Sequence, residues 1–573
     1  KESALIMRKQ TKLVAVLSTA ALLAIGASMT SFAAQGWAEE DGTWVYYDKN
    51  GDKVNEAWKK SGDNWFWLDS EEGGAMATDK LIDDDNNTYY VDGNGVMVTN
   101  TWVKVVNEDQ DDDDDPAEYR YYYMQSNGKA YRQSSSSGKV SKKTIDGKQY
   151  AFDDEGRMLY GWVSKDGSMA NDDDGWNTTD EMYYFGGWED GSMKTGWQRI
   201  SVYDSEKEDD YDYWFNFKSN GERRQNNNKK KINGKYYAFD SRGVMVYEWY
   251  QTGSGSDASA SNWNYFSSPE DGARYVKGWF KVAPPTEDNS FDETSATFAS
   301  SDSDDESERW YYADENGLVD SKIKKIKGKY YAFAPEGDIA GRMLHGLCAL
   351  QMNGDEIVRV IDKDMDSDAL DDFLDTYGVE ATNDVFLYYF GDADDGAMKT
   401  GSVSLNLDGD SYSFYFGKNG GAESKGRGLN GIYDDCIYQY GKKIKADSDE
   451  KYILVYADGN SGDASVTVAD FNGSDLRNIV NGNASAPDGV DLGTLTYDRT
   501  TDKNSDDDTV NYITGFATEN LYIVNTSGKI QDSKLSAKKD GDDWYWYALK
   551  NNKIKYYANS KNLKKTELEN WDN

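Results

Sequence analysis

The sequence has very little histidine or cysteine, which excludes several kinds of catalytic and metal site. Its 573 residues include one histidine, His345, and two cysteines, Cys348 and Cys436. A serine–histidine–aspartate triad or a histidine-rich zinc site would depend on that single imidazole, which we expect to be structural. Two cysteines cannot form a disulfide scaffold or a four-thiolate metal site, and their spacing leaves open whether they pair.

Basic residues, proline and aliphatic residues are also scarce. Lysine and arginine total 63 against 103 acidic residues, a formal net charge of −40 that argues against binding to nucleic acid or to anionic lipid headgroups. In contrast, there are 43 Tyr, 18 Trp and 19 Phe, too many aromatics for a disordered chain. With 54 Gly and only 6 Pro, the composition favours many short turns around an aromatic core.

The N-terminal segment 1–33 has the pattern of a secretory signal peptide. Basic residues precede an apolar run at 13–25, and Ser31, Phe32 and Ala33 place small residues at the −3 and −1 positions of a cleavage site. That run is short for a membrane anchor, and no later stretch is apolar enough to cross a bilayer. We therefore predict an exported protein with no membrane span after signal removal, held at a surface only by binding.

From residue 34 onward, aromatic pairs recur at spacings as short as about 20 residues. Most are followed by a polar turn with Asp or Asn and Gly, then often Met, then Gly-Trp, as at Gly161-Trp162, Gly196-Trp197 and Gly278-Trp279. Aromatic residues favour strands, and we expect Gly-bearing turns of three to five residues to join them into hairpins. A lone hairpin is marginal in water, so the predicted fold is all-β: an elongated solenoid of stacked β-hairpin repeats with a few non-repeat insertions.

Three hairpin types alternate between residues 119 and 401, with a super-repeat of about 90 residues. Acidic inserts at 107–118, 203–212 and 284–308 precede one of these types and are expected to be solvated loops. The predicted division of the chain is a repeat array at 34–350, an inserted element at 351–385, degenerate repeats at 386–459, a non-repeat β insertion at 460–520, and terminal repeats or a cap at 521–573.

One helix is expected, at Asp368–Tyr377, next to an acidic segment that partly matches a calcium loop. Asp364, Asp366 and Asp368 fit its first three ligand positions, but Ala369 replaces the glycine of position 6 and Asp375 the usual glutamate of position 12. We therefore predict no metal site, and the sequence calls for no cofactor.

The repeat units resemble the cell-wall-binding repeats of the choline-binding and glucan-binding type in surface proteins of Gram-positive bacteria. Residues 182–197 and 310–317 carry the resemblance best, and it covers most of 34–447 and returns at 521–557. The resemblance implies a β-hairpin solenoid and non-covalent attachment to wall polymers.

In choline-binding relatives, three aromatics form a cage: the Trp of Gly-Trp, the first residue of Trp-Tyr-Tyr, and a ring of the next hairpin. That first residue is Trp310 in one unit, but Thr88, Gln149, Met182 or Leu387 in others, so most cages are expected to lack a wall. A sugar needs only one or two aromatic platforms, which favours wall or extracellular carbohydrate over choline. The candidate platforms are Trp162, Tyr184, Trp197, Trp214, Tyr237, Trp249, Trp279 and Trp310.

The sequence thus predicts a non-catalytic surface protein of a Gram-positive cell wall, since no non-repeat segment is large enough for a usual catalytic domain. The predicted partners are wall polysaccharide, teichoic acid or choline, with host glycans or proteins as further candidates. Two alternatives stay open: a structural, self-assembling coat or adhesin protein whose repeats are only scaffold, and a released glycan-binding protein.

Overall fold

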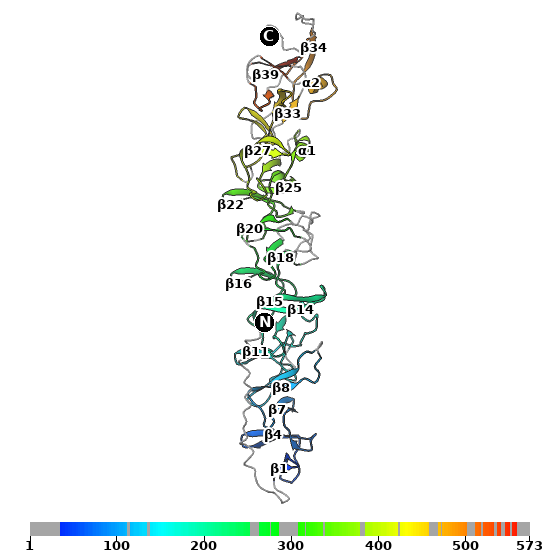
Figure 1. Ribbon diagram of the computed structural model, residues 1–573, viewed down its shortest axis with the longest axis vertical. Coiled ribbons are helices and arrows are strands. Elements are labelled where there is room, and N and C mark those ends of the chain that lie inside the picture. The colour runs from blue at the N-terminus through cyan, green and yellow to red at the C-terminus, as the bar shows by residue number, and fades with distance from the viewer. Residues whose placement is uncertain are drawn as a thin grey trace. The chain divides into compact units, whose positions relative to one another are not determined.

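The computed structural model describes residues 35–558 with internal gaps (Figure 1). The gaps are 112–114, 134–137, 252–262, 276, 286–290, 292–306, 316, 336–338, 379–383, 422–423, 458–467, 472, 501–509, 517–519, 532–535, 540–544 and 550–552. The predicted signal peptide at 1–33 and most of the acidic insert at 284–308 lie outside the described residues.

The described chain is almost entirely β, as the sequence predicts, and it divides into two compact units. The first comprises Lys1–Lys230 and Ala238–Met245, and the second comprises Lys231–Tyr237 and Val246–Asn573. The strands of the first unit are β1 (Gly36–Glu40), β2 (Thr43–Tyr47), β3 (Ala57–Ser61), β4 (Asn64–Asp69), β5 (Ala75–Met76), β6 (Lys80–Asp84), β7 (Asn87–Val91), β8 (Thr101–Val106), β9 (Tyr119–Met124), β10 (Lys142–Ile145), β11 (Lys148–Ala151), β12 (Trp162–Ser164), β13 (Met182–Tyr184), β14 (Gly196–Asp204) and β15 (Asp209–Phe217). The division between units falls within β16 (Asn227–Ile232) and β17 (Lys235–Phe239).

The second unit contains the remaining strands and two helices. Its strands are β18 (Glu248–Gln251), β19 (Trp263–Phe266), β20 (Gly278–Val282), β21 (Arg309–Ala313), β22 (Lys322–Ile326), β23 (Lys329–Phe333), β24 (Leu347–Asn353), β25 (Glu356–Asp362), β26 (Val385–Tyr389), β27 (Gly401–Leu407), β28 (Asp410–Phe416), β29 (Gly431–Tyr433), β30 (Cys436–Gln439), β31 (Lys442–Lys443), β32 (Tyr452–Ala457), β33 (Val468–Phe471), β34 (Thr496–Thr500), β35 (Val510–Thr514), β36 (Leu521–Asn525), β37 (Ser536–Lys539), β38 (Tyr545–Leu549) and β39 (Lys553–Ala558). The helices are α1 (Ser367–Tyr377) and α2 (Gly473–Val480). Among the residues that the structure describes, no helix is long and apolar enough to cross a membrane.

Most strands pair with their sequence neighbours in small antiparallel sheets. Two-stranded sheets predominate, such as β6–β7, β8–β9 and β20–β21, and five-stranded sheets occur at β1–β5, β22–β26, β27–β31 and β34–β39 without β36. Larger sheets are therefore concentrated in the second unit, where the repeat pattern of the sequence fades.

Several hairpin loops have two residues, shorter than the three to five predicted. Asp41 and Gly42 have φ values of 47° and 82°, and Asp146 and Gly147 have 48° and 81°. Two consecutive positive φ values are the mark of the type I′ turn, whose twist matches that of the flanking strands. The Asp- and Gly-bearing turns that come after the aromatic pairs follow the hairpin instead of closing it.

That following turn brings the chain back to the hairpin it has just left. The carboxylate of Asp92 accepts hydrogen bonds from the backbone N–H groups of Asn94 and Val96, each at 2.9 Å. Gly95, with φ of 76°, donates its N–H to the Asp92 carbonyl at 2.7 Å. Met97 then pairs with Val91 as a single bridge, so the recurring spacing of Asp, Gly and Met returns the chain to the edge of the hairpin.

The residue after each turn also joins its hairpin to the preceding one. The N–H of Met97 donates to the Trp65 carbonyl at 2.8 Å, and Met158 donates in the same way to Tyr121 at 2.7 Å. In the second unit, Met343 donates to the Trp310 carbonyl at 2.8 Å. The Met side chain in turn lies under the turn glycine of the next repeat, since a Cβ on Gly128 would stand 2.5 Å from Met97 Sδ.

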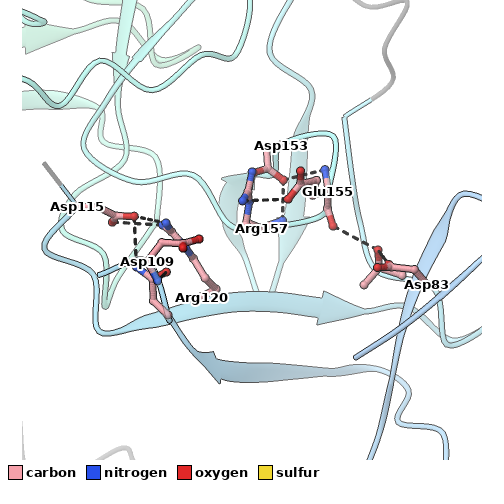
Figure 2. Close-up of polar contacts among 9 residues, drawn as sticks. Asp83, Asp109, Asp115, Arg120, Asp153, Glu155 and Arg157 are labelled. Atoms are coloured by element: carbon pink, nitrogen blue, oxygen red, sulfur yellow. Dashed lines mark hydrogen bonds and ion pairs between the residues drawn. The ribbon is translucent and has the colours of Figure 1, made fainter. Parts of the chain in front are cut away.

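Two of the acidic inserts are more ordered than solvated loops. Asp115 pairs with Arg120, as Figure 2 shows, and accepts hydrogen bonds from Asn107 Nδ2 at 3.2 Å and Tyr160 Oη at 2.8 Å. The segment 203–212 forms the end of the hairpin β14–β15, whose strands have nine residues each. Asp204 lies opposite Asp209 in this hairpin. In the first insert Arg120 compensates Asp115, and in the second the paired strands extend into the acidic segment.

The predicted helix is confirmed as α1, and a second helix was missed. Asp366 caps α1 by accepting a hydrogen bond from the Ala369 N–H at 2.8 Å, and Leu370 and Phe373 bury its apolar face. Helix α2 lies within 460–520, which the sequence analysis assigned to strands. The spacing of Leu476, fully buried, from Ile479 at the next turn is the helical signal that was overlooked.

Cys348 and Cys436 are both buried and unpaired, which settles the question that their spacing left open. Burial raises the pKa of the Cys348 thiol to about 12. The thiol is therefore protonated at neutral pH and unreactive as a nucleophile.

Candidate functional site: aromatic clusters around the tryptophans

The hairpins place tryptophans directly opposite aromatic residues of the paired strand. This cross-strand arrangement packs large rings against each other at the closest side-chain distance a sheet offers. The pairs are Trp37–Tyr46, Trp58–Trp67, Trp102–Tyr123, Trp162–Tyr184, Trp249–Tyr265 and Trp279–Tyr312. At Trp197 the opposite residue is Asn216, so the pattern is broken there.

A third ring comes from the following hairpin. The ring centroids of Trp58 and Tyr89 are 5.1 Å apart, those of Trp102 and Tyr150 4.9 Å, and those of Trp279 and Tyr331 4.8 Å. These three clusters therefore have the wall that the sequence-based expectation assigned as missing in most units. The second wall is the cross-strand aromatic, and the residue before the aromatic pair is not needed for it.

Carboxylates lie beside two of these three-ring clusters, whose tryptophans are half-buried. Asp84 Oδ2 accepts a hydrogen bond from Trp58 Nε1 at 3.1 Å. In the Trp102 cluster, burial raises the pKa of the Tyr123 hydroxyl and the charge of Asp146 adds to that rise. Each cluster thus combines aromatic faces with a negative charge at its edge, an environment that stabilises a cation.

The Trp279 cluster has a fourth ring and its own ion pair. Trp310 meets Trp279 edge to face at a centroid distance of 6.2 Å, and both rings are half-buried. Lys281 Nζ lies 5.8 Å from the Trp310 centroid and 3.0 Å from Asp394 Oδ1. Trp310 Nε1 lies 3.4 Å from the same carboxylate oxygen, so Asp394 links the lysine to the ring.

The Trp162 cluster is filled by the chain itself. Trp162 is 6% exposed, with Phe215 at a centroid distance of 5.0 Å. The guanidinium carbon of Arg223 lies 5.6 Å from the Trp162 centroid, and its nitrogens donate to the carbonyls of Trp176 at 2.7 Å and Thr178 at 2.5 Å. Burial lowers the pKa of Arg223 to about 10, which leaves it charged at neutral pH.

Arg223 occupies the repeat position that Met97 and Met158 hold elsewhere. Its N–H donates to the carbonyl of Met182 in the preceding hairpin at 2.8 Å, the same bond that those methionines make. The longer side chain reaches the loop around Trp176, whose carbonyls it satisfies. At this position Arg223 therefore places a charged group inside the protein, where other repeats have a methionine side chain.

The other predicted platforms differ in exposure. Trp249 is fully buried, its Nε1 donating to the Ala283 carbonyl at 2.8 Å, and Tyr237 is 8% exposed, so neither fits a platform for a sugar ring. Tyr184 is half-buried and belongs to the filled Trp162 cluster. Trp197 and Trp214 are half-buried and meet edge to face at 6.4 Å.

Trp58 and Trp102 are not among the platforms predicted from the sequence, because neither follows a glycine in a Gly-Trp pair. In these hairpins the positive φ falls two positions before the tryptophan, on Glu56 at 46° and Asn100 at 51°. Asparagine adopts this conformation more readily than most residues, so Asn100 was a usable signal. Glu56 carried none.

The segment that resembles a calcium loop has other roles. Asp366 is the α1 N-cap, and Asp364 Oδ1 lies 3.6 Å from His345 Nδ1. Within the described ranges, no group of three or more His, Cys, Asp or Glu side chains is placed to hold a metal ion.

No protein-family model and no curated protein matches this chain. Solved structures similar to it include choline-binding proteins of Streptococcus pneumoniae, the type of protein that the sequence resembles. The autolysin LytC, in complex with a synthetic peptidoglycan ligand, is 17% identical, with 56% of this chain and 55% of LytC covered and a TM-score of 0.29. This chain thus spans about half the length of the LytC chain it matches.

Two further similar structures are covered over their whole length. The choline-binding domain of CbpL is 22% identical, covers 43% of this chain and gives a TM-score of 0.26. Choline-binding protein F is 15% identical, covers 72% of this chain and gives a TM-score of 0.22.

Proposed function

We propose that this chain is a non-catalytic surface protein that attaches to the cell wall of a Gram-positive bacterium through its aromatic clusters. The observation that carries the proposal is the three-ring cluster built in the same register around Trp58, Trp102 and Trp279. The three tryptophans are only half-buried, so aromatic faces stay available at several points along the chain.

The clusters make choline the ligand to test first and wall carbohydrate the second. The sequence favours carbohydrate, because the residue before the aromatic pair is not aromatic in most units and a choline cage would lack that wall. Three rings with a carboxylate nearby, as at Trp58 with Asp84, can desolvate a quaternary ammonium group, a gain of about 2 kcal/mol for a cation over aromatic faces.

We also propose that the hairpins of each unit stack as a solenoid. Support comes from the repeated hydrogen bond between the residue after each turn and the preceding hairpin, as from Met97 to Trp65 and from Met343 to Trp310. Such nearest-neighbour links are the interface of a repeat protein. Several weak ligand sites in one stack would bind a polymeric wall with avidity.

The proposal is tested by sedimentation of the full chain with purified Gram-positive cell walls. The wild-type protein should sediment and be released by choline, or by wall saccharide fragments if carbohydrate is the ligand. The triple variant Trp58→Ala/Trp102→Ala/Trp279→Ala should stay in solution, while Tyr433→Ala, an exposed ring outside these clusters, should sediment like the wild type. Absence of wild-type sedimentation would overturn wall attachment and favour a scaffold role.

A further inference from the structure

A cavity in the second unit is lined mainly by basic side chains. Its volume is about 200 Å³, and its polar lining consists of Arg309, Arg342, His345, Lys363 and Asp364. Three permanent cations thus meet one carboxylate, in a chain whose formal net charge is −40. Because salt screens charges beyond about 8 Å at physiological ionic strength, these nearby cations set the local potential of the cavity.

Two of these cations lack a compensating partner in the part of the chain that the structure describes. Neither Arg342 nor Lys363 forms an ion pair there, and Arg342 Nε is buried without a hydrogen-bond partner. By contrast, Lys324 and Lys329 of the neighbouring hairpin pair with Asp314 at 3.1 Å and Asp395 at 3.3 Å. Arg342 Nε itself is closed to solvent, so an acceptor in the cavity would bond to the terminal guanidinium nitrogens of Arg342.

The cavity lining is held in place by the backbone around it. Met343 is bonded to the Trp310 carbonyl at 2.8 Å, and Met365 is bonded to the Leu347 carbonyl at 2.9 Å. Gly346, with φ of 71°, lets Asp364 approach so closely that a Cβ there would stand 2.1 Å from Asp364 Oδ1. The backbone hydrogen bonds therefore hold the segments that carry the basic side chains.

We propose that this cavity binds a phosphate group, carried either by a phosphodiester or by free inorganic phosphate. The planar guanidinium groups of Arg309 and Arg342 match the oxygen pairs of a phosphate, and Lys363 adds a point charge. A phosphate offers more acceptor oxygens and charge than a carboxylate, which suits three cations. Met343 lines the cavity and also packs in the Trp279 cluster, so the two lie next to each other, but the proposal uses only the basic side chains and does not rest on wall attachment.

The test is calorimetric titration of the full chain, in a phosphate-free buffer of low ionic strength, with two probes. Inorganic phosphate represents the free ion, and glycerophosphoglycerol represents a phosphodiester. Arg342→Gln and Lys363→Gln should each weaken binding roughly tenfold, as expected for loss of one charge-assisted hydrogen bond. Arg359→Gln, an exposed arginine of β25 outside the cavity lining, is the matched control and should bind like the wild type.

Each outcome of the titration either supports the phosphate site or overturns it. Binding of both probes, or of one, with loss confined to the cavity variants supports the site and identifies the source of the phosphate. Absence of heat with both probes overturns it, as does equal weakening by Arg359→Gln. If Arg342→Gln fails to fold, the exposed Lys363 still tests the proposal, and the fold of each variant is checked by thermal unfolding.

Discussion

The guanidinium carbon of Arg223 lies 5.6 Å from the centroid of the Trp162 ring. A cation of the chain therefore already stands over a ring that is 6% exposed, whereas the lysines over Trp310 and Tyr312 in the Trp279 cluster lie over half-buried rings. The same guanidinium donates to the backbone carbonyls of Trp176, Thr178 and Asp180. In the Trp162 repeat, the ring face is therefore covered by Arg223 of the same chain.

Arg223→Met restores the residue type of the other repeats and should destabilise the protein by about 1–3 kcal/mol, since buried carbonyls lose a charged donor. Urea unfolding followed by tryptophan fluorescence measures this loss. Wall sedimentation of the variant should not fall, because the filled cluster makes no contribution to it. A variant as stable as the wild type would show that the carbonyls find other donors.

Replacing tryptophan should have opposite consequences in a filled and an open cluster. Trp162→Ala removes a ring that is 6% exposed and should cost about 3–5 kcal/mol of stability. Trp102→Ala removes a half-buried ring, so its cost in stability should be smaller and its cost in choline or saccharide binding larger. Thermal unfolding and calorimetric titration of both variants provide the comparison. Equal losses of binding would contradict the assignment of Trp162 as closed.

The contact between Met97 and Gly128 predicts an unusually costly glycine substitution. Gly128 and Gly42 have nearly equal φ values, 80° and 82°, so alanine is strained at both by about 1 kcal/mol. Only at Gly128 would the new Cβ strike a side chain, Met97 Sδ at 2.5 Å, whereas nothing lies within 4 Å at Gly42. Gly128→Ala should therefore unfold at a lower temperature than Gly42→Ala. The double variant Met97→Ala/Gly128→Ala should recover the part of the loss that comes from the clash.

Asp115 should make the stability of the first unit depend on pH. Burial raises its pKa, but the Tyr160 hydrogen bond and the charge of Arg120 outweigh it and hold the pKa below the usual value. A carboxyl with a lowered pKa stabilises the fold above its unfolded pKa, near 4, and loses that contribution as the pH falls through its folded value. Asp115→Asn should therefore lower the melting temperature at pH 7 and leave it nearly unchanged at about pH 2. A difference that persisted in acid would assign the effect to packing.

The sequence by itself determined most of the strands and the repeat, but not helix α2. Alternating aromatics, the Asp-x-x-Gly turns and the Met that follows them are local signals, and they specify hairpins because each acts within a few residues. Helix α1 was predicted at Asp368–Tyr377, whereas Asp366, assigned from the sequence to a partial calcium loop, is its N-cap. The aromatic composition predicted a core of rings, which the cross-strand pairs confirm.

Only the tertiary structure decided which rings are open and which are closed. Trp102 and Trp162 have similar partners within their own hairpins, but Arg223 reaches Trp162 from 61 positions further along the chain. The third ring of each cluster and the basic cavity around Arg342 also combine side chains from separate hairpins. These features depend on how one repeat is placed against the next, and no local pattern of residues encodes that placement.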